Sequence, residues 1–202
     1  MSTRSHFDPA ADDVNAYSLL TALVVPRPIA WISTLSAAGV GNLAPHSFFT
    51  IVSADPPIVA FSSIGDKDTL RNVRETGEFA ISLAPRAMLD DVNATSAKFH
   101  PETDEATAVG VTMQTSSAVG PPVVADSPAS IECTLHSTID LGTATLVLGT
   151  VVWMSVADSV LVDGRPSYEK LAVVSRLGGD EWGLPSGVLS VKRPARPEDI
   201  RR

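Results

Sequence analysis

The stretch RPIAWISTLSAAGVGNLAPHSFF, residues 27–49, begins like one arm of a β-hairpin and ends among small polar side chains. Its apolar, β-branched part at residues 29–36 leads into a glycine-containing turn at residues 37–41, which predicts a strand followed by a tight turn. The return arm begins at Asn42, and a segment after Pro45 that is rich in Phe, Thr, Ile and Val (residues 47–53) is predicted to be a strand. The tip of this hairpin therefore carries hydroxyl and amide groups where apolar packing is expected, which needs a functional explanation.

The rest of the chain predicts many strands and few helices. Apolar or alternating segments predict strands at residues 58–63, 79–84, 130–142, 143–158 and 159–164, the last three forming a meander. Helical spacing and end signals predict helices at residues 15–24, 67–76 and 86–96, and the acidic residues 100–111 are expected to form a surface loop or an irregular helix. In the second helix, Asp68 or Thr69 is the expected N-cap and Gly77 the expected stop. This pattern is typical of a β-barrel with helical attachments.

Charge and composition exclude several classes of protein. The 202 residues carry a formal net charge of −8. The tail at residues 186–202 has five cations and two anions, so the rest of the chain carries −11. An acidic body argues against a nucleic-acid partner, because duplex binding needs clustered cations. No apolar run reaches the ~20 residues of a membrane helix and no signal peptide is apparent, so we expect no membrane association and a cytoplasmic protein.

Motifs for metal or hydrolytic chemistry are missing from the sequence. Cys133 is the single cysteine, and His6, His46, His100 and His136 are far apart, so no metal site is predicted. The pattern Gly39-x-Gly41-x-x-Ala44 matches the dinucleotide fingerprint, but that fingerprint requires a following helix. Residues 47–53 are poor helix formers, and the glycines fit the hairpin turn better.

Two clusters of polar residues remain. One lies on the hairpin and contains Ser33, Thr34, Asn42 and Ser47. The other precedes the second helix and contains Ser62, Ser63, Lys67 and Thr69. Hydroxyl and amide groups suit a flat ring rich in carbonyls and ring nitrogens, whereas a cation at a helix N-terminus suits a phosphate. The two clusters together predict a ligand such as FMN.

The segments at residues 27–49, 55–63, 67–83 and 176–182 (RLGGDEW), in this order, make the chain resemble the flavin reductase-like, FMN-binding split-barrel family, including its flavoredoxin-like members. The resemblance covers residues 15–185 and leaves residues 1–14 as an N-terminal extension and 186–202 as a basic tail. It implies a mainly β fold, a six-stranded antiparallel split barrel of Greek-key type with flanking helices. It also implies a homodimer with FMN near the subunit interface, FAD being the less favoured flavin.

Carried over to this sequence, the resemblance implies a set of cofactor-binding residues. These are Trp31, Ser33, Thr34, Asn42, Ala44, Pro45, His46, Ser47, Ser62, Ser63, Lys67, Asp68, Thr69, Asn93, Ser96 and Arg176. Asn93 and Ser96 belong to the segment NATSAKF, and Arg176 belongs to RLGG. Where relatives often carry Tyr after RLGG, this chain has Trp182.

The leading functional hypothesis is an NAD(P)H-dependent flavin reductase, in which the nicotinamide C4 passes a hydride to flavin N5. Such chemistry belongs to the cofactor and needs little acid–base machinery from the protein. His46 is the candidate catalytic residue, in contact with flavin or nicotinamide, with a purely structural role in the turn as the alternative. The reduced flavin could serve a monooxygenase or another redox partner. The alternatives are a non-enzymatic FMN electron carrier and a barrel whose flavin site has decayed.

Overall fold

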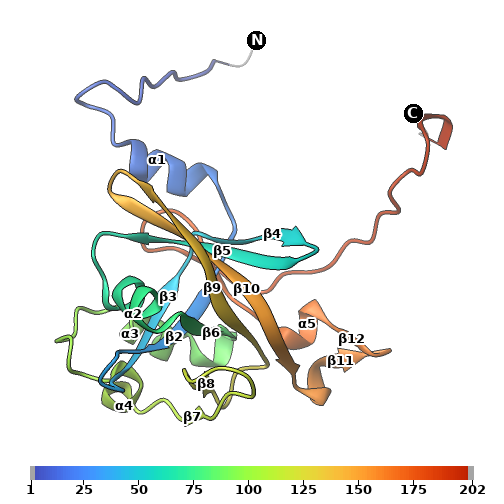
Figure 1. Ribbon diagram of the computed structural model, residues 1–202. Helices are drawn as coiled ribbons and strands as arrows, with labels where there is room; N and C mark the ends of the chain where they lie inside the picture. The colour runs from blue at the N-terminus through green and yellow to red at the C-terminus, as the bar shows by residue number, and fades with distance from the viewer. Residues whose placement is uncertain (1–2, 200–202) are drawn as a thin grey trace.

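Seven antiparallel strands form the main sheet of the computed structural model, which describes residues 3–199 (Figure 1). The strands lie in the order β3-β2-β6-β9-β10-β5-β4. Their bounds are β2 Ala30–Leu35, β3 Gly41–His46, β4 Phe49–Ala54, β5 Pro57–Ile64, β6 Glu78–Leu83, β9 Ala129–Leu141 and β10 Ala144–Val156. Because β3 and β4 are the two edges of this order, the sheet stays open, as in a split barrel. The predicted mainly β split barrel with flanking helices is confirmed.

The sheet has one strand more than the six predicted, because the return arm of the first hairpin is itself a strand. β3 pairs with β2, and β4 starts only at Phe49. Pro45 lies inside β3, opposite Trp31. A proline is tolerated in an edge strand, where its missing N–H can point away from the ladder. β3 lacks the apolar alternation typical of a strand, because it contains Asn42, Pro45 and His46.

Helices and short strands surround the main sheet. The helices are α1 Ala16–Leu23, α2 Asp68–Thr76, α3 Leu89–Ala94, α4 Glu105–Val109 and α5 Tyr168–Leu171, with 3₁₀ turns η1 Arg86–Met88, η2 Asp158–Val160 and η3 Pro197–Asp199. The short strands are β1 Arg27–Pro28 with β13 Ser175–Arg176 and β14 Trp182–Gly183, β7 Met113–Gln114 with β8 Val123–Val124, and β11 Leu161–Val162 with β12 Arg165–Pro166. The segment at 159–164 therefore forms a small separate hairpin and not a third strand of the β9–β10 meander. No helix among the described residues has both the length and the apolar character to cross a membrane.

The predicted C-terminal end of helix α2 is confirmed, but its predicted N-cap is wrong. Gly77 has φ of 74° and follows the last helical residue, as a left-handed C-terminal stop requires. The N-cap is Lys67, whose side chain makes no capping bond. Asp68 is already helical and pairs with Arg71, while the Thr69 side chain is buried.

The alternation of β2 and β3 divides the core between the two faces of their hairpin. Ile32 belongs to the cluster packed against α2, with Leu70 and Val73. Trp31 and Leu43 belong to a second cluster, which packs against α3 and α4. A strand presents successive side chains to opposite faces. The even-numbered residues of this hairpin therefore face α2, and the odd-numbered ones face α3 and α4.

Candidate functional site

An accessible cavity of about 140 Å³ lies at the end of β3, on the odd-numbered face of the hairpin. Five residues predicted from the sequence line it, from three separate segments: Pro45, Ser47, Asn93, Ser96 and Arg176. Ile29 and Trp182 complete the lining. The fold thus brings together polar groups from the hairpin, from the end of α3 with the turn after it, and from the short strand β13.

The turn after α3 is held against the hairpin from behind. The indole N–H of the fully buried Trp31 donates a hydrogen bond of 2.9 Å to Thr95 Oγ1, and the Thr95 hydroxyl donates to the carbonyl of Val92. The Ser96 hydroxyl donates to the carbonyl of Asn93, at 2.6 Å. Trp31 therefore lies behind the cavity wall and positions the turn, and its predicted direct contact with a cofactor does not fit this burial.

Arg176 is held by the two short strands that flank it. Its guanidinium stacks over the Trp182 ring, 4.8 Å from the ring centre, and Nη2 donates to the carbonyl of Gly179 at 2.7 Å. Gly183, opposite Ser175 in the β13–β14 pair, packs so closely that an added Cβ would lie 2.3 Å from Ser175 Oγ. This close packing fixes the pair of strands that carries Arg176 and Trp182.

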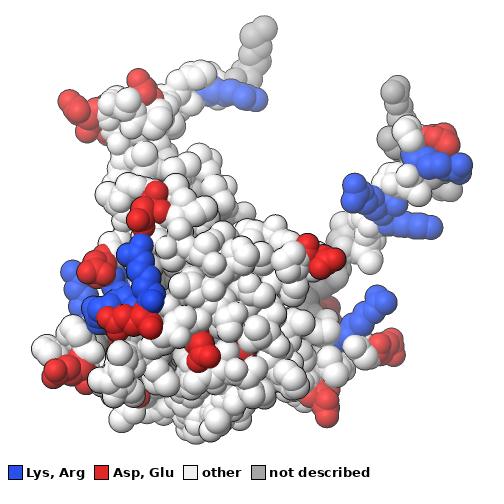
Figure 2. Space-filling model, viewed as in Figure 1, with Lys and Arg blue, Asp and Glu red and all other residues white. Residues whose placement is uncertain are grey.

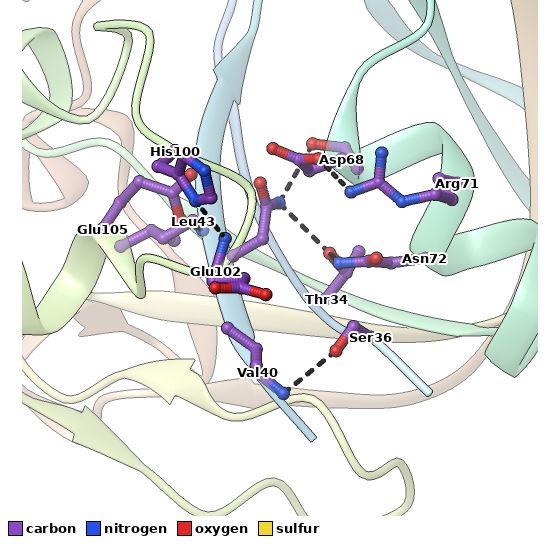
Figure 3. A network of polar contacts seen from close by, with 12 residues as sticks. Thr34, Ser36, Val40, Leu43, Asp68, Arg71, Asn72, His100, Glu102 and Glu105 are labelled. Atoms are coloured by element: carbon purple, nitrogen blue, oxygen red, sulfur yellow. Dashed lines mark hydrogen bonds and ion pairs between the residues drawn. The ribbon is translucent and has the colours of Figure 1, made fainter. Parts of the chain in front are cut away.

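The even-numbered face carries a buried polar network. The Asn42 amide donates to Thr34 Oγ1 at 3.1 Å and to Thr69 Oγ1 at 3.0 Å. The Asn72 amide donates to the same Thr34 oxygen at 3.0 Å, a bond drawn in Figure 3. His46 Nε2 lies 3.3 Å from Thr69 Oγ1. All five side chains are 7% exposed or less, so the network joins β2, β3 and α2 as a structural unit.

His46 is neutral in this environment. Burial, and after it the charge of Lys67, lower the pKa of His46 from 6.5 to about 4, although a hydrogen bond to the Ser62 backbone opposes the shift. Thr69 Oγ1 accepts from Asn42, so its own hydrogen is free to be donated to His46 Nε2. The ring also packs 4.9 Å from that of Phe61. A side chain only 6% exposed cannot reach a nicotinamide, so this environment fits the structural alternative for His46.

The remaining predicted residues fall into two groups. Ser33 and Ser63 are buried: the Ser33 hydroxyl donates to the carbonyl of Pro122, whereas Ser63 Oγ has no partner among the described residues. Ala44 and Ser62 are half-buried, Lys67 is exposed at the start of α2, and Asp68 is engaged by Arg71 (Figure 3). Of the second predicted cluster, Lys67 is thus the accessible cation. The first N–H groups of α2 lie beside it without acceptors inside the helix.

Sequence reasoning missed Ile29 as a cavity residue and Glu105 as a buried carboxylate. Glu105 Oε2 accepts the Leu43 N–H at 2.9 Å on the outer edge of β3 (Figure 3). Burial raises the pKa of Glu105, and the Leu43 hydrogen bond opposes that rise. Ile29 offered no signal beyond its place in a strand, and Glu105 was hidden in an acidic stretch that suggested a surface loop. No three His, Cys, Asp or Glu side chains within residues 3–199 are grouped so that they could hold a metal ion.

Comparisons with known proteins agree with this architecture. Residues 22–172 match the flavin reductase like domain family. An uncharacterised protein of Halalkalibacterium halodurans is 37% identical over 190 residues, which cover 88% of this chain and 90% of the relative. Nitrilotriacetate monooxygenase component B from Bacillus cereus has a similar structure, with a TM-score of 0.89 and 30% identity over 95% of this chain and 100% of that one. The flavoredoxin of Desulfovibrio vulgaris shares the fold, with a TM-score of 0.78, 22% identity and coverage of 95% and 99%. The chain therefore belongs to the flavin reductase-like family of split-barrel proteins.

Proposed function

We propose that the chain binds FMN at the cavity beside β3 and acts as an NAD(P)H-dependent flavin reductase. The observation that carries the proposal is the convergence of Ser47, Asn93 and Arg176 from three distant segments on one accessible cavity. Membership of the flavin reductase-like family supports the choice of ligand.

The donors and walls of the cavity fit a flavin ring. Ile29, Pro45 and Trp182 offer apolar surface to a planar ring. The Ser47 hydroxyl, the Asn93 amide and the Arg176 guanidinium can donate to its carbonyl oxygens and ring nitrogens, whereas the Ser96 hydroxyl, whose hydrogen goes to the Asn93 carbonyl, can accept from it. A cavity of about 140 Å³ with an open side would enclose part of the ligand and leave the rest at the surface.

The FMN phosphate would extend to the start of α2. Lys67 is exposed there, and the helix N-terminus favours an anion. His46 links the two regions, because it lies in β3 next to Ser47 and its ring contacts Thr69 of α2. The chain's own part is to bind, orient and exclude water, since no accessible acid–base pair lines the cavity. Bound FMN would supply the redox chemistry, namely hydride transfer from the nicotinamide and onward transfer of the electrons.

A matched pair of variants tests the placement of the ligand. Arg176→Gln is expected to weaken binding of both FMN and riboflavin, because Arg176 lies at the ring cavity. Lys67→Gln is expected to weaken FMN binding about tenfold and to leave riboflavin binding unchanged, as loss of one charge-assisted phosphate contact would. Fluorescence titration of the purified protein measures both. Equal losses for FMN and riboflavin with Lys67→Gln would contradict the phosphate assignment.

Steady-state oxidation of NADH and NADPH, with and without added FMN, tests the reductase activity. Turnover with either nucleotide supports the proposal. A protein that retains FMN but is reduced only by a protein donor would be an electron carrier. The similarity to a monooxygenase component B suggests that the reduced flavin serves a monooxygenase partner.

The proposal includes a homodimer, because the open sheet exposes apolar side chains on a largely uncharged face (Figure 2). Ile51 and Val52 of β4 are 75% and 50% exposed, and Trp153 and Met154 of β10 are 50% and 67% exposed. Large apolar side chains exposed on the strands of an open sheet favour association with a second copy. Light scattering after size exclusion measures the mass, and a monomer at micromolar concentration would contradict this part of the proposal.

A further inference from the structure

The C-terminal arm, residues 184–191, leaves the body of the molecule as an apolar extended segment (Figure 1). Four of its side chains are apolar and exposed: Leu184 at 50%, Val188 at 62%, Leu189 at 86% and Val191 at 78%. Apolar side chains exposed to water carry a free-energy cost, and that cost is removed only when another surface covers them. The arm runs away from the body of its own chain, so its own chain does not cover these side chains (Figure 1).

An apolar groove of about 510 Å³ lies between α1 and the start of β4. Its walls include Tyr17 and Leu20 of α1, which are 61% and 59% exposed, Val24 directly after the helix, which is 61% exposed, and Phe48, which is 37% exposed. In α1 the single buried side chain is Thr21, so the apolar stripe of this helix faces outward. The groove is therefore an unfilled surface of the same chemical character as the arm.

The charges next to the arm and next to the groove are opposite. Lys192 and Arg193 follow the apolar arm directly, and both are exposed. Asp12 and Asp13 lie just before α1 and are also exposed. Figure 2 shows the basic groups on the C-terminal arm and the acidic groups around the segment that leads into α1. An arm that places its apolar part in the groove can bring its cations to these carboxylates.

We propose that residues 184–191 of one copy occupy the groove between α1 and β4 of a second copy, with Lys192 and Arg193 facing Asp12 and Asp13. This rests on the homodimer proposed above. Eight fully extended residues span about 27 Å. Ser47 lines both the groove and the candidate flavin cavity, so the docked arm would form part of the wall beside the ligand.

Cysteine cross-linking tests the arm exchange. Leu20→Cys combined with Val188→Cys is expected to give a disulfide-linked dimer under mild oxidation, seen on a non-reducing gel. The native Cys133 can stay, because it is fully buried and burial raises the pKa of its thiol to about 12. The matched control is Val162→Cys with Val188→Cys: Val162 is 46% exposed on the β11–β12 hairpin, and this pair is expected to stay unlinked. The single variant Val188→Cys reports on linkage between two arms.

Three outcomes would overturn the proposal, and they are distinguishable. A disulfide within one chain would mean that the arm folds onto its own groove. A dimer by light scattering without cross-linking would leave the homodimer intact and remove the arm from it. A monomer would remove both, while flavin titration would still report on the cavity.

Charge reversal gives a second, independent readout. Lys192→Glu with Arg193→Glu is expected to slow cross-linking of the Leu20→Cys and Val188→Cys pair about two- to fivefold, the size that exposed ion pairs allow. Adding Asp12→Lys and Asp13→Lys should restore the rate, and high salt should reduce both effects. A cross-linking rate unchanged by both charge reversals would overturn the pairing of Lys192 and Arg193 with Asp12 and Asp13.

Discussion

The two faces of the β2–β3 hairpin carry similar small polar side chains in opposite environments. On the α2 face, Thr34, Asn42 and Thr69 bond to one another and are closed to water. On the α3 face, Ser47 and Asn93 line an accessible cavity and leave polar groups for a ligand. The difference teaches that a polar residue near a ligand site has one of two functions, to bind the ligand or to fix the strand that binds it. Substitutions on the two faces should therefore change different quantities.

The largest effect is expected for Thr34→Val, on the buried face. Valine keeps the shape but removes the oxygen that accepts from both Asn42 and Asn72, leaving two amide N–H groups without that acceptor. Each such loss costs about 1–3 kcal/mol, so the free energy of unfolding should fall by about 2–6 kcal/mol. Denaturant titration measures it. Ser36→Ala removes a single hydrogen bond, from the Val40 N–H in the turn (Figure 3), and serves as the control with a loss near 1 kcal/mol.

A pH series should give the next largest effect, through His46. Its folded pKa of about 4 lies below the value of 6.5 for the unfolded chain, so its stability contribution is complete above pH 6.5. As pH falls from 6.5 to about 4, His46 binds a proton in the unfolded chain but not in the folded one. The free energy of unfolding therefore falls by about 3 kcal/mol over this window. The slope of unfolding free energy against pH should flatten in this window for His46→Gln. The raised pKa of Glu105 contributes a slope of the opposite sign. This contribution cancels in the comparison, because the unmodified protein and His46→Gln both contain Glu105. An unchanged slope would mean that His46 is protonated in the fold.

Trp31→Phe, on the α3 face, should lower both stability and FMN affinity, with a smaller effect on stability. The change removes the N–H that bonds to Thr95 behind the cavity, and leaves a smaller ring at a fully buried position. Stability is expected to fall by about 1–3 kcal/mol, and FMN affinity should fall as well, because the turn that carries Asn93 and Ser96 loses its anchor. Thermal unfolding and flavin titration test the two parts. Lost stability with unchanged FMN affinity would separate this turn from the ligand site.

Asn93→Ala should have the smallest effect on stability. Its side chain is exposed at the cavity, so the free energy of unfolding should change by less than about 0.5 kcal/mol. FMN affinity should fall about three- to tenfold, as loss of one hydrogen bond to the ligand predicts. Binding and unfolding measured on the same preparation give the comparison. A stability loss as large as that of Thr34→Val would place Asn93 with the structural residues.

Much of the fold could be predicted from the sequence, because strand alternation and turn residues are local signals. Gly77 ends α2 as expected, and the β9–β10 meander follows its apolar pattern. β3 was the exception, since its polar residues and Pro45 resemble a loop until an edge strand is considered. The cap of α2 was misassigned because Thr69 is used in a long-range hydrogen bond, which no local rule reveals.

The sequence could predict several residues of the candidate site, but not which of the predicted residues lie together in space. The motifs name Ser47, Asn93 and Arg176, which do meet. The same motifs also name Thr34 and Asn42, which are buried on the other face, because sequence order does not tell which residues α2 covers. Glu105 could not be found from its charge, since most acidic residues in such a stretch are solvated.

The outer edge of β3 has a consequence for how the protein avoids aggregation. An exposed edge strand is a template on which another chain can add a strand. Here the N–H of Leu43 is occupied by the Glu105 carboxylate, and Pro45 has no N–H to offer. A second strand would therefore find few donors along this edge. The barrel can keep the edge open to a small molecule without inviting polymerisation.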